Sequence, residues 1–168
     1  MEIKRLSESE AQALWDLRHM ALSTEPDAFG ESLEEHLQTP VEVTAERLRV
    51  GGEDNFVIGA FNEATLVGMV GFYRETRIKR RHRGWIWGTF VAPEWRGRGL
   101  ARRLMEEAIG RARQIAGMRY VLLSVSAGQD AARGLYAGLG FEVYAFEPEA
   151  IQAGGRFIDM EHMRLKLN

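Results

Sequence analysis

The clearest alternation of apolar and polar positions lies between Trp85 and Ala116. An apolar run extends from Trp85 to Val91, and Pro93 closes it because proline cannot donate to a sheet ladder. Beyond it, apolar residues recur at helical spacing and form one stripe. The stripe consists of Leu100, Ala101, Leu104, Met105, Ala108, Ala112 and Ile115. This stretch therefore predicts a strand, a turn containing glycines and a long helix.

The rest of the chain alternates between strand and helix patterns. Ser7 and Glu10 form a capping box, which predicts a helix from Glu8, and Gly140 is placed to end a later helix. The other predicted strands are 2–6, 55–61, 66–75, 118–126, 141–146 and 156–167, with helices at 33–37, 40–48 and 129–139 and a turn region at 148–155. This order predicts an α/β fold in which a mixed sheet of about seven strands carries helices on both faces. We expect one domain over residues 1–168.

Composition narrows the classes of function. With 168 residues, a net charge of −2 and 27% charged residues, the chain is unlike a general nucleic-acid binder or a binder of anionic membranes. The absence of cysteine excludes disulfides, thiolate metal sites and a cysteine nucleophile. The N-terminus lacks the apolar region of a signal peptide, and no apolar run is long enough for a membrane span. We expect a cytoplasmic protein.

The start of the predicted long helix carries an unusual charge. Arg96 and Arg98 precede it and Arg102 and Arg103 lie in its first turn, where cations oppose the helix dipole by roughly 0.3–1 kcal/mol each. Glycines at 97 and 99 let the backbone approach a ligand closely. These features favour an anion-binding turn over the alternative, a solvated basic surface.

Two other glycine motifs fit the turn poorly. A dinucleotide fingerprint needs a third glycine where Arg102 stands, and an acidic residue after the strand at 120–126. A P-loop needs Gly-Lys-Ser/Thr after the glycines, and that sequence is absent.

The turn instead resembles the first signature of the GNAT acetyltransferase superfamily. Arg96-Gly97-Arg98-Gly99-Leu100-Ala101 fits its R/Q-x-x-G-x-G/A pattern, after an apolar strand. Leu135-Tyr136-Ala137-Gly138-Leu139-Gly140-Phe141 is similar to the second signature, L-Y-x-x-x-G-F. The resemblance implies the GNAT fold, with acetyl-CoA as the bound anion and acyl donor and its pyrophosphate on the turn.

The resemblance also implies roles for individual residues. The backbone of the central strand would pair with the pantetheine arm, and the Val91 N–H would stabilise the oxyanion. Tyr136 would donate a proton to the departing thiolate; the alternative is a tyrosine of the core. The cofactor-binding candidates are Thr89, Phe90, Val91, Arg96, Gly97, Arg98, Gly99, Leu100, Ala101, Arg102, Gln129 and Tyr136.

The sequence departs from the family pattern in two places. Gln129 stands where the family often has an asparagine that contacts pantetheine; it carries the same amide on a longer arm. No carboxylate occupies the usual positions of the general base, which correspond to Trp85 or Trp87 and to Ser124. Deprotonation of the amine would therefore run through water or through an acid elsewhere.

The last predicted strand offers such an acid. Asp159 and Glu161 share the parity of Met163 and Leu165, which places both carboxylates on the inward face unless a bulge resets the phase. Inward, Glu161 would serve as a base and Asp159 would bind the charge of the amine. If a bulge shifts the phase of the strand, Asp159 and Glu161 would instead form a pair on the surface.

Other residues are candidates for contact with the amine acceptor. Phe29 and Glu31 lie in the segment that forms part of the acceptor pocket in GNAT proteins, although a solvated loop is the alternative. Trp87 would wall the pocket, unless it packs against a helix. The four histidines show no metal-ligand spacing and are interpreted as surface or packing residues, so we expect no metal site.

These patterns together predict an N-acetyltransferase that moves an acetyl group from acetyl-CoA to a primary amine by direct attack in a ternary complex. The acceptor is a small-molecule or peptide amine, with neither nucleic acid nor membrane as partner. Two alternatives stay open: transfer of another acyl group, and a catalytically weak CoA-binding sensor or interaction module. Homodimers are common in the family, but no stretch of this sequence requires one.

Overall fold

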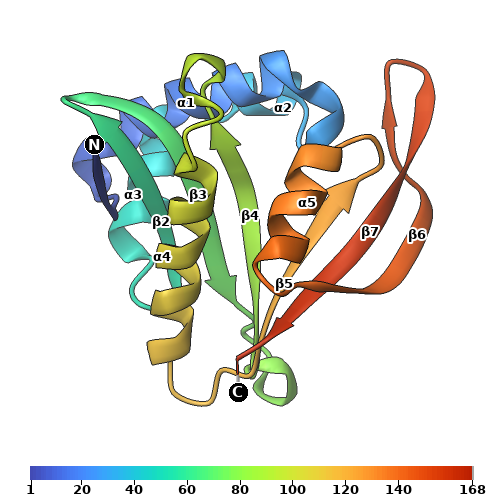
Figure 1. Ribbon diagram of the computed structural model, residues 1–168. Coiled ribbons are helices and arrows are strands. Elements are labelled where there is room, and N and C mark those ends of the chain that lie inside the picture. Colours follow the sequence, from blue (N-terminus) through green and yellow to red (C-terminus); the bar gives the residue numbers. More distant parts are fainter. Residues whose placement is uncertain (168) are drawn as a thin grey trace.

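The computed structural model describes residues 1–167, which form one seven-stranded mixed sheet in the order β1-β2-β3-β4-β5-β7-β6 (Figure 1). β4 and β5 pair in parallel, and the other neighbouring strands pair antiparallel. The strands are β1 (Glu2–Arg5), β2 (Asn55–Asn62), β3 (Thr65–Arg74), β4 (Arg83–Val91), β5 (Tyr120–Ser126), β6 (Glu142–Ala153) and β7 (Arg156–Lys166). The predicted fold class is confirmed.

Helices cover both faces of this sheet, as expected. Met69 of β3 shares an apolar cluster with Leu17 and Leu48, whereas its neighbour Val70 shares the opposite cluster with Leu104. Adjacent strand residues point to opposite faces, so each strand contributes to both cores. One face carries α1 (Ala11–Thr24) and α3 (Val41–Val50), the other carries α4 (Leu100–Gln114) and α5 (Asp130–Gly138), and a short helix, α2 (Leu33–Gln38), follows α1.

A β-bulge interrupts the central strand β4. Phe90 pairs with Met69 and Trp87 pairs with Gly71, so two residues of β4, Gly88 and Thr89, lie opposite one residue of β3. Gly88 has a φ of 64°, a left-handed conformation that glycine adopts without strain. Such a bulge bends the strand and increases its local twist.

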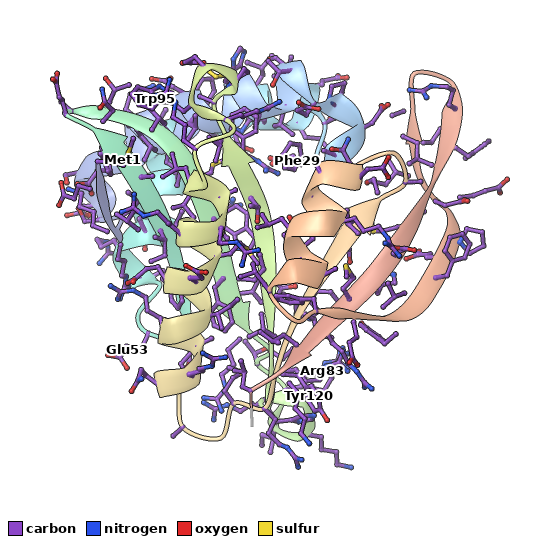
Figure 2. All side chains as sticks on the ribbon, viewed as in Figure 1. Met1, Phe29, Glu53, Arg83, Trp95 and Tyr120 are labelled. Carbon is purple, nitrogen blue, oxygen red and sulfur yellow. The ribbon has the colours of Figure 1, made fainter. Side chains whose placement is uncertain are left out.

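Beyond its first residues, β4 parts from β5. The two strands pair only from Arg83 to Trp85 and from Tyr120 to Leu122. Figure 2 shows Arg83 and Tyr120 together at the paired end, with Phe29 at the opposite end, where the strands have diverged. The carboxyl ends of parallel strands are where open α/β sheets bind ligands.

The hairpin at the C-terminal end differs from the prediction. Residues 148–155 were expected to form a turn, but β6 continues through Pro148 to Ala153. β6 is an edge strand whose register shifts between Glu147 and Ile151, and proline is tolerated at such an edge bulge because no ladder N–H is required there. The actual turn is Gly154-Gly155, with both φ angles positive.

The start of α1 also differs slightly from the expected helix at Glu8. Residues Glu8–Glu10 form a 3-10 turn, and the α-helix begins at Ala11. The Glu10 carboxylate accepts hydrogen bonds from the Ser7 N–H at 2.7 Å and from Lys4 Nζ at 2.9 Å. Burial disfavours its charged form, but the hydrogen bonds of Ser7 and Lys4 outweigh burial and lower the pKa of Glu10 to about 2.

This carboxylate generates a prediction about stability. Because the folded state lowers the pKa of Glu10 below the ordinary value of about 4.3, its stabilisation is present at neutral pH and is lost as the pH falls towards 2. Glu10→Gln should lower the free energy of unfolding by about 1 kcal/mol at pH 7, measured by urea titration, with little effect near pH 2. Glu8→Gln is the control; an equal loss in both variants would contradict the assignment.

Candidate functional site

The parted ends of β4 and β5 enclose a cleft of about 460 Å³. Its walls come from β4 from Ile86 onward, from β5 from Leu123 onward, from the turn before α4 and from α5. Phe29, from the segment after α1, closes one side. Figure 1 shows α4 and α5 on either side of this opening, each starting at the end where the strands diverge.

Nearly all predicted cofactor residues line this cleft. They are Thr89, Phe90, Val91, Arg96, Gly97, Gly99, Leu100, Ala101, Arg102, Gln129 and Tyr136. Arg98 is not among the lining residues. Its Nη2 donates to the Glu94 carbonyl at 3.3 Å, and its guanidinium lies 4.7 Å from the centre of the Trp95 ring. Trp95, labelled in Figure 2, thus packs against Arg98, although only Trp95 lines the cleft.

The turn before α4 presents bare backbone to the cleft. Gly97 and Gly99 both have a φ of 73°, and a Cβ added to either would meet no atom within 4 Å. Gly99 is the N-cap of α4, whose first turn contains no acidic residue. Unpaired N–H groups at a helix start attract anions, so this open turn fits a phosphate group.

Two arginines are fixed at the rim of the turn. Arg96 donates from Nε to the Val91 carbonyl at 3.0 Å, and its Nη1 lies 2.9 Å from the Glu25 carboxylate. Arg102 reaches from α4 towards the Gly138 carbonyl of α5, at 3.4 Å. Both guanidinium groups therefore lie beside the glycines, Arg96 paired with Glu25 and Arg102 3.8 Å from the Glu106 carboxylate.

Tyr136 projects from α5 into the cleft and is 7% exposed. Gly140, with a φ of 91°, ends the helix as predicted and returns the chain so that the Phe141 N–H bonds to the Tyr136 carbonyl. Burial raises the pKa of the Tyr136 phenol, and hydrogen bonding with the Thr89 hydroxyl opposes this shift. A phenol with a raised pKa stays protonated at neutral pH and is able to donate its proton.

A second cavity of about 220 Å³ lies behind Trp87. Aromatic and charged side chains line it, among them Trp15, Arg18, Glu31, His36, Tyr73 and Trp87. Trp87 lines both cavities, so it separates them. Of the two predicted acceptor residues near position 30, Phe29 therefore lines the main cleft and Glu31 lines the second cavity.

Arg18 connects these acceptor candidates. Its Nε and Nη2 lie 3.0 and 2.9 Å from the Glu31 carboxylate. Its guanidinium also lies over the Phe29 ring, at 4.6 Å, and near the Trp87 ring, at 5.9 Å. With its side chain only 13% exposed, Arg18 holds Glu31, Phe29 and Trp87 in one arrangement.

The two acidic candidates of β7 lie elsewhere. Glu161 is paired with Arg133 of α5 at 2.6 Å, and the Asp159 carboxylate accepts the Glu149 N–H at 2.9 Å. Both line a separate hollow beside α5 and do not line the main cleft. The parity argument expected both carboxylates on the inward face of the sheet, but Glu161 pairs there with Arg133, which lines the separate hollow and not the main cleft.

One cluster escaped the sequence interpretation. Ser124 lines the main cleft, and its Oγ lies 2.7 Å from Nδ1 of His162, whose Nε2 lies 2.8 Å from the Glu147 carboxylate. His162 had been interpreted as a surface or packing residue. The parity of β7 places His162 on the face opposite Glu161, and only the register of β7 against β5 brings it beside Ser124.

The described residues contain neither a metal-binding cluster nor a helix able to cross a membrane. Within residues 1–167, no group of three or more histidine, aspartate or glutamate side chains is arranged to hold a metal ion. Across the same part of the chain, each helix is too short or too polar to span a bilayer.

Comparison with known proteins assigns the family. The profile described as "Acetyltransferase (GNAT) family" matches residues 14–141, which is most of the chain. The chain belongs to the GNAT family. Residues 14–141 of this GNAT protein include the cleft, the glycine turn and Tyr136, and the resemblance seen in the sequence is confirmed.

Solved GNAT structures share the fold of this GNAT protein. An acetyltransferase of the GNAT family from Streptococcus pneumoniae is 23% identical, with 98% of each chain covered and a TM-score of 0.88. A GNAT superfamily phosphinothricin acetyltransferase from Sinorhizobium meliloti, solved in complex with AcCoA, is 17% identical, with 99% of this chain and 88% of that chain covered and a TM-score of 0.85.

A curated relative matches over a shorter stretch. The L-methionine sulfoximine/L-methionine sulfone acetyltransferase of Pseudomonas aeruginosa is 34% identical over 79 residues. These residues represent 47% of this GNAT protein and 45% of the relative, so about half of the relative's length is matched.

The Arg18–Glu31 pair generates a prediction about stability. Arg18→Met removes the partner of a partly buried carboxylate, so the free energy of unfolding should fall by about 1–3 kcal/mol in urea titrations at pH 7. Arg49→Met is the matched control, because Arg49 pairs with Glu46 at 2.7 Å with both side chains more than half exposed. Loss of that pair should change stability by less than about 0.5 kcal/mol. Equal losses in the two variants would contradict the role of Arg18.

Proposed function

We propose that this GNAT protein is an N-acetyltransferase that moves an acetyl group from acetyl-CoA to a primary amine by direct attack in a ternary complex. The observation that carries the proposal is the cleft between β4 and β5. This cleft brings together an open glycine turn, an unpaired strand edge and a buried tyrosine. The acetyl-CoA bound to the Sinorhizobium meliloti neighbour supports the same donor here.

The unpaired edge of β4 supports binding of the pantetheine arm. The Ala92 N–H bonds to the Val67 carbonyl of β3 at 2.9 Å. Backbone groups alternate along a strand, so the N–H of the preceding residue, Val91, is directed towards the cleft. An extended arm lying along Thr89 to Val91 would add to the sheet as a further strand. The glycine turn and Arg96 would then hold the pyrophosphate.

Each step of the transfer has a candidate group. The Val91 N–H stabilises the oxyanion that forms when the amine attacks the thioester; such a donor contributes roughly 2.7–4 kcal/mol in acyl transfer. Tyr136 protonates the departing thiolate. Gln129 lines the same cleft at the start of α5, from where its amide reaches the pantetheine arm.

The acceptor is proposed to enter past Trp87, with Phe29 on the side of the main cleft and Glu31 in the second cavity. A small-molecule or peptide amine suits this size, and the Pseudomonas aeruginosa relative, named for two methionine derivatives, supports a small acceptor. Asp159 and Glu161 line neither of these cavities, so we propose no contact between them and the acceptor. A cytoplasmic location and a homodimer stay predictions from the sequence.

The turn yields a binding prediction. Gly97→Val introduces a side chain where φ is 73° and fills the space left for the pyrophosphate. We expect the dissociation constant for CoA to rise by about tenfold or more in titration calorimetry. Gly110→Val is the control, because the space around Gly110 in α4 is also open but lies outside the cleft. Similar affinities in the two variants would place the pyrophosphate elsewhere.

Thiol release from acetyl-CoA across a panel of amines tests the function. The wild-type protein should release thiol with at least one amine, and Tyr136→Phe should lower kcat by about tenfold or more while CoA affinity is kept. Tyr120→Phe, outside the cleft, is the matched control. CoA binding without thiol release would support the sensor alternative, and release from other acyl-CoAs only would identify a different acyl donor.

A further inference from the structure

Three neighbouring strands align a serine, a histidine and a carboxylate. Ser124 of β5 pairs in register with His162 of β7, and His162 pairs with Ala145 of β6, two residues before Glu147. All three side chains stand on the face of the sheet opposite that of Met163, which packs in the α4 core. Their contacts of 2.7 and 2.8 Å form one continuous hydrogen-bonded chain.

The carboxylate at the outer end determines the direction of this chain. An ionised glutamate only accepts hydrogen bonds, so the His162 Nε2 carries a proton and donates it to Glu147. In the neutral imidazole, Nδ1 is then the acceptor and takes the Ser124 O–H. The remaining lone pairs of Ser124 Oγ are left to accept a proton from the cleft, which Ser124 lines.

Direct acetyl transfer needs a group in the cleft that accepts a proton. The acceptor amine is an ammonium ion at neutral pH and must lose a proton before it attacks the thioester. The carboxylate expected for this task, Glu161, lies outside the cleft, as does Asp159, which was expected to bind the charge of the amine. Ser124, in contrast, lies on β5 where the strand faces the parted end of β4.

We propose that Ser124, His162 and Glu147 form the proton relay that deprotonates the acceptor amine, an inference that rests on the proposed acetyl transfer. A proton passes from the ammonium to Ser124 Oγ as the Ser124 proton passes to His162 Nδ1. The step leaves a neutral amine, an intact serine hydroxyl and an imidazolium ion paired with the Glu147 carboxylate. Only protons move, and no covalent bond to Ser124 forms.

The outer end of the relay provides a route for the proton to leave. The side chain of His162 is 20% exposed and that of Glu147 is 54% exposed, so the imidazolium returns its proton to water before the next turnover. Other titratable groups surround the ring. Tyr144 of β6 lies 6.2 Å from it, and Arg164, two residues along β7, lies over the Tyr144 ring. The turn Pro26–Ala28 packs on β5 and β6, and its Asp27 is neutralised by Arg156.

Kinetics of variants test the relay. Ser124→Ala and His162→Gln should lower kcat/KM for a basic amine by about tenfold to a hundredfold and shift the acidic limb of its pH profile. Affinity for CoA should stay unchanged, and Ser124→Thr, which keeps the hydroxyl, should retain most of the rate. With hydroxylamine as the acceptor, the loss of kcat/KM in Ser124→Ala and His162→Gln should be smaller, because hydroxylamine is already uncharged at the pH of the assay. Glu142→Gln, an exposed glutamate of the same strand β6, is the control.

A measurement without turnover separates the relay from the proposed function. Nitrogen-15 NMR of the imidazole should show His162 protonated at Nε2, and Glu147→Gln should change this tautomer. Thiol release at wild-type rates in the Ser124→Ala and His162→Gln variants would overturn the relay and leave acetyl transfer standing. Acetylation of Ser124, seen by mass spectrometry, would also overturn it, because the serine would then be a nucleophile. Absence of thiol release in the wild-type protein with every amine would overturn the proposed function itself.

Discussion

The separation of β4 from β5 is the constraint on which the site depends. A sheet normally satisfies the backbone groups of an inner strand from both sides, and β4 gives up this pairing after Trp85. The bulge at Gly88 and Thr89 bends the strand at this point, while the pairing of β4 with β3 resumes at Phe90. The cleft is therefore produced by the sheet itself, and the apolar cores on its two faces keep the strands in place.

Elements far apart in the sequence meet in that opening. The turn before α4 supplies bare amides and two anchored arginines, α5 supplies Tyr136, and β5 supplies Ser124. Arg96 and Arg102 lie at one end, with Glu25 paired to Arg96, and the Arg18–Glu31 pair and the aromatic groups of the second cavity lie beyond Trp87. In the proposed function, the anionic donor occupies the cleft and the cationic acceptor approaches from the side of the second cavity.

The sequence predicted local features well and long-range ones poorly. The glycine turn, the helix at Leu100 and the cap at Gly140 depend on neighbouring residues, and each was found. The side of the turn on which Arg98 lies depends on its contact with the Trp95 ring, which spacing does not reveal. The contact of His162 with Ser124 was missed because it depends on the register of β7 against β5, and the predicted β6 was too short because Pro148 is tolerated on an edge strand.

The position of Trp87 has a consequence for how such a protein changes its acceptor. The indole is the shared wall of two spaces, and its Arg18 contact ties it to the segment after α1 and not to the turn before α4. Under the proposed function, a smaller side chain at this position would widen the space for the acceptor and leave the glycine turn before α4 in place. If acetyl transfer proceeds as proposed, the range of acceptors would then change through a single residue while the turn that binds the donor stays the same.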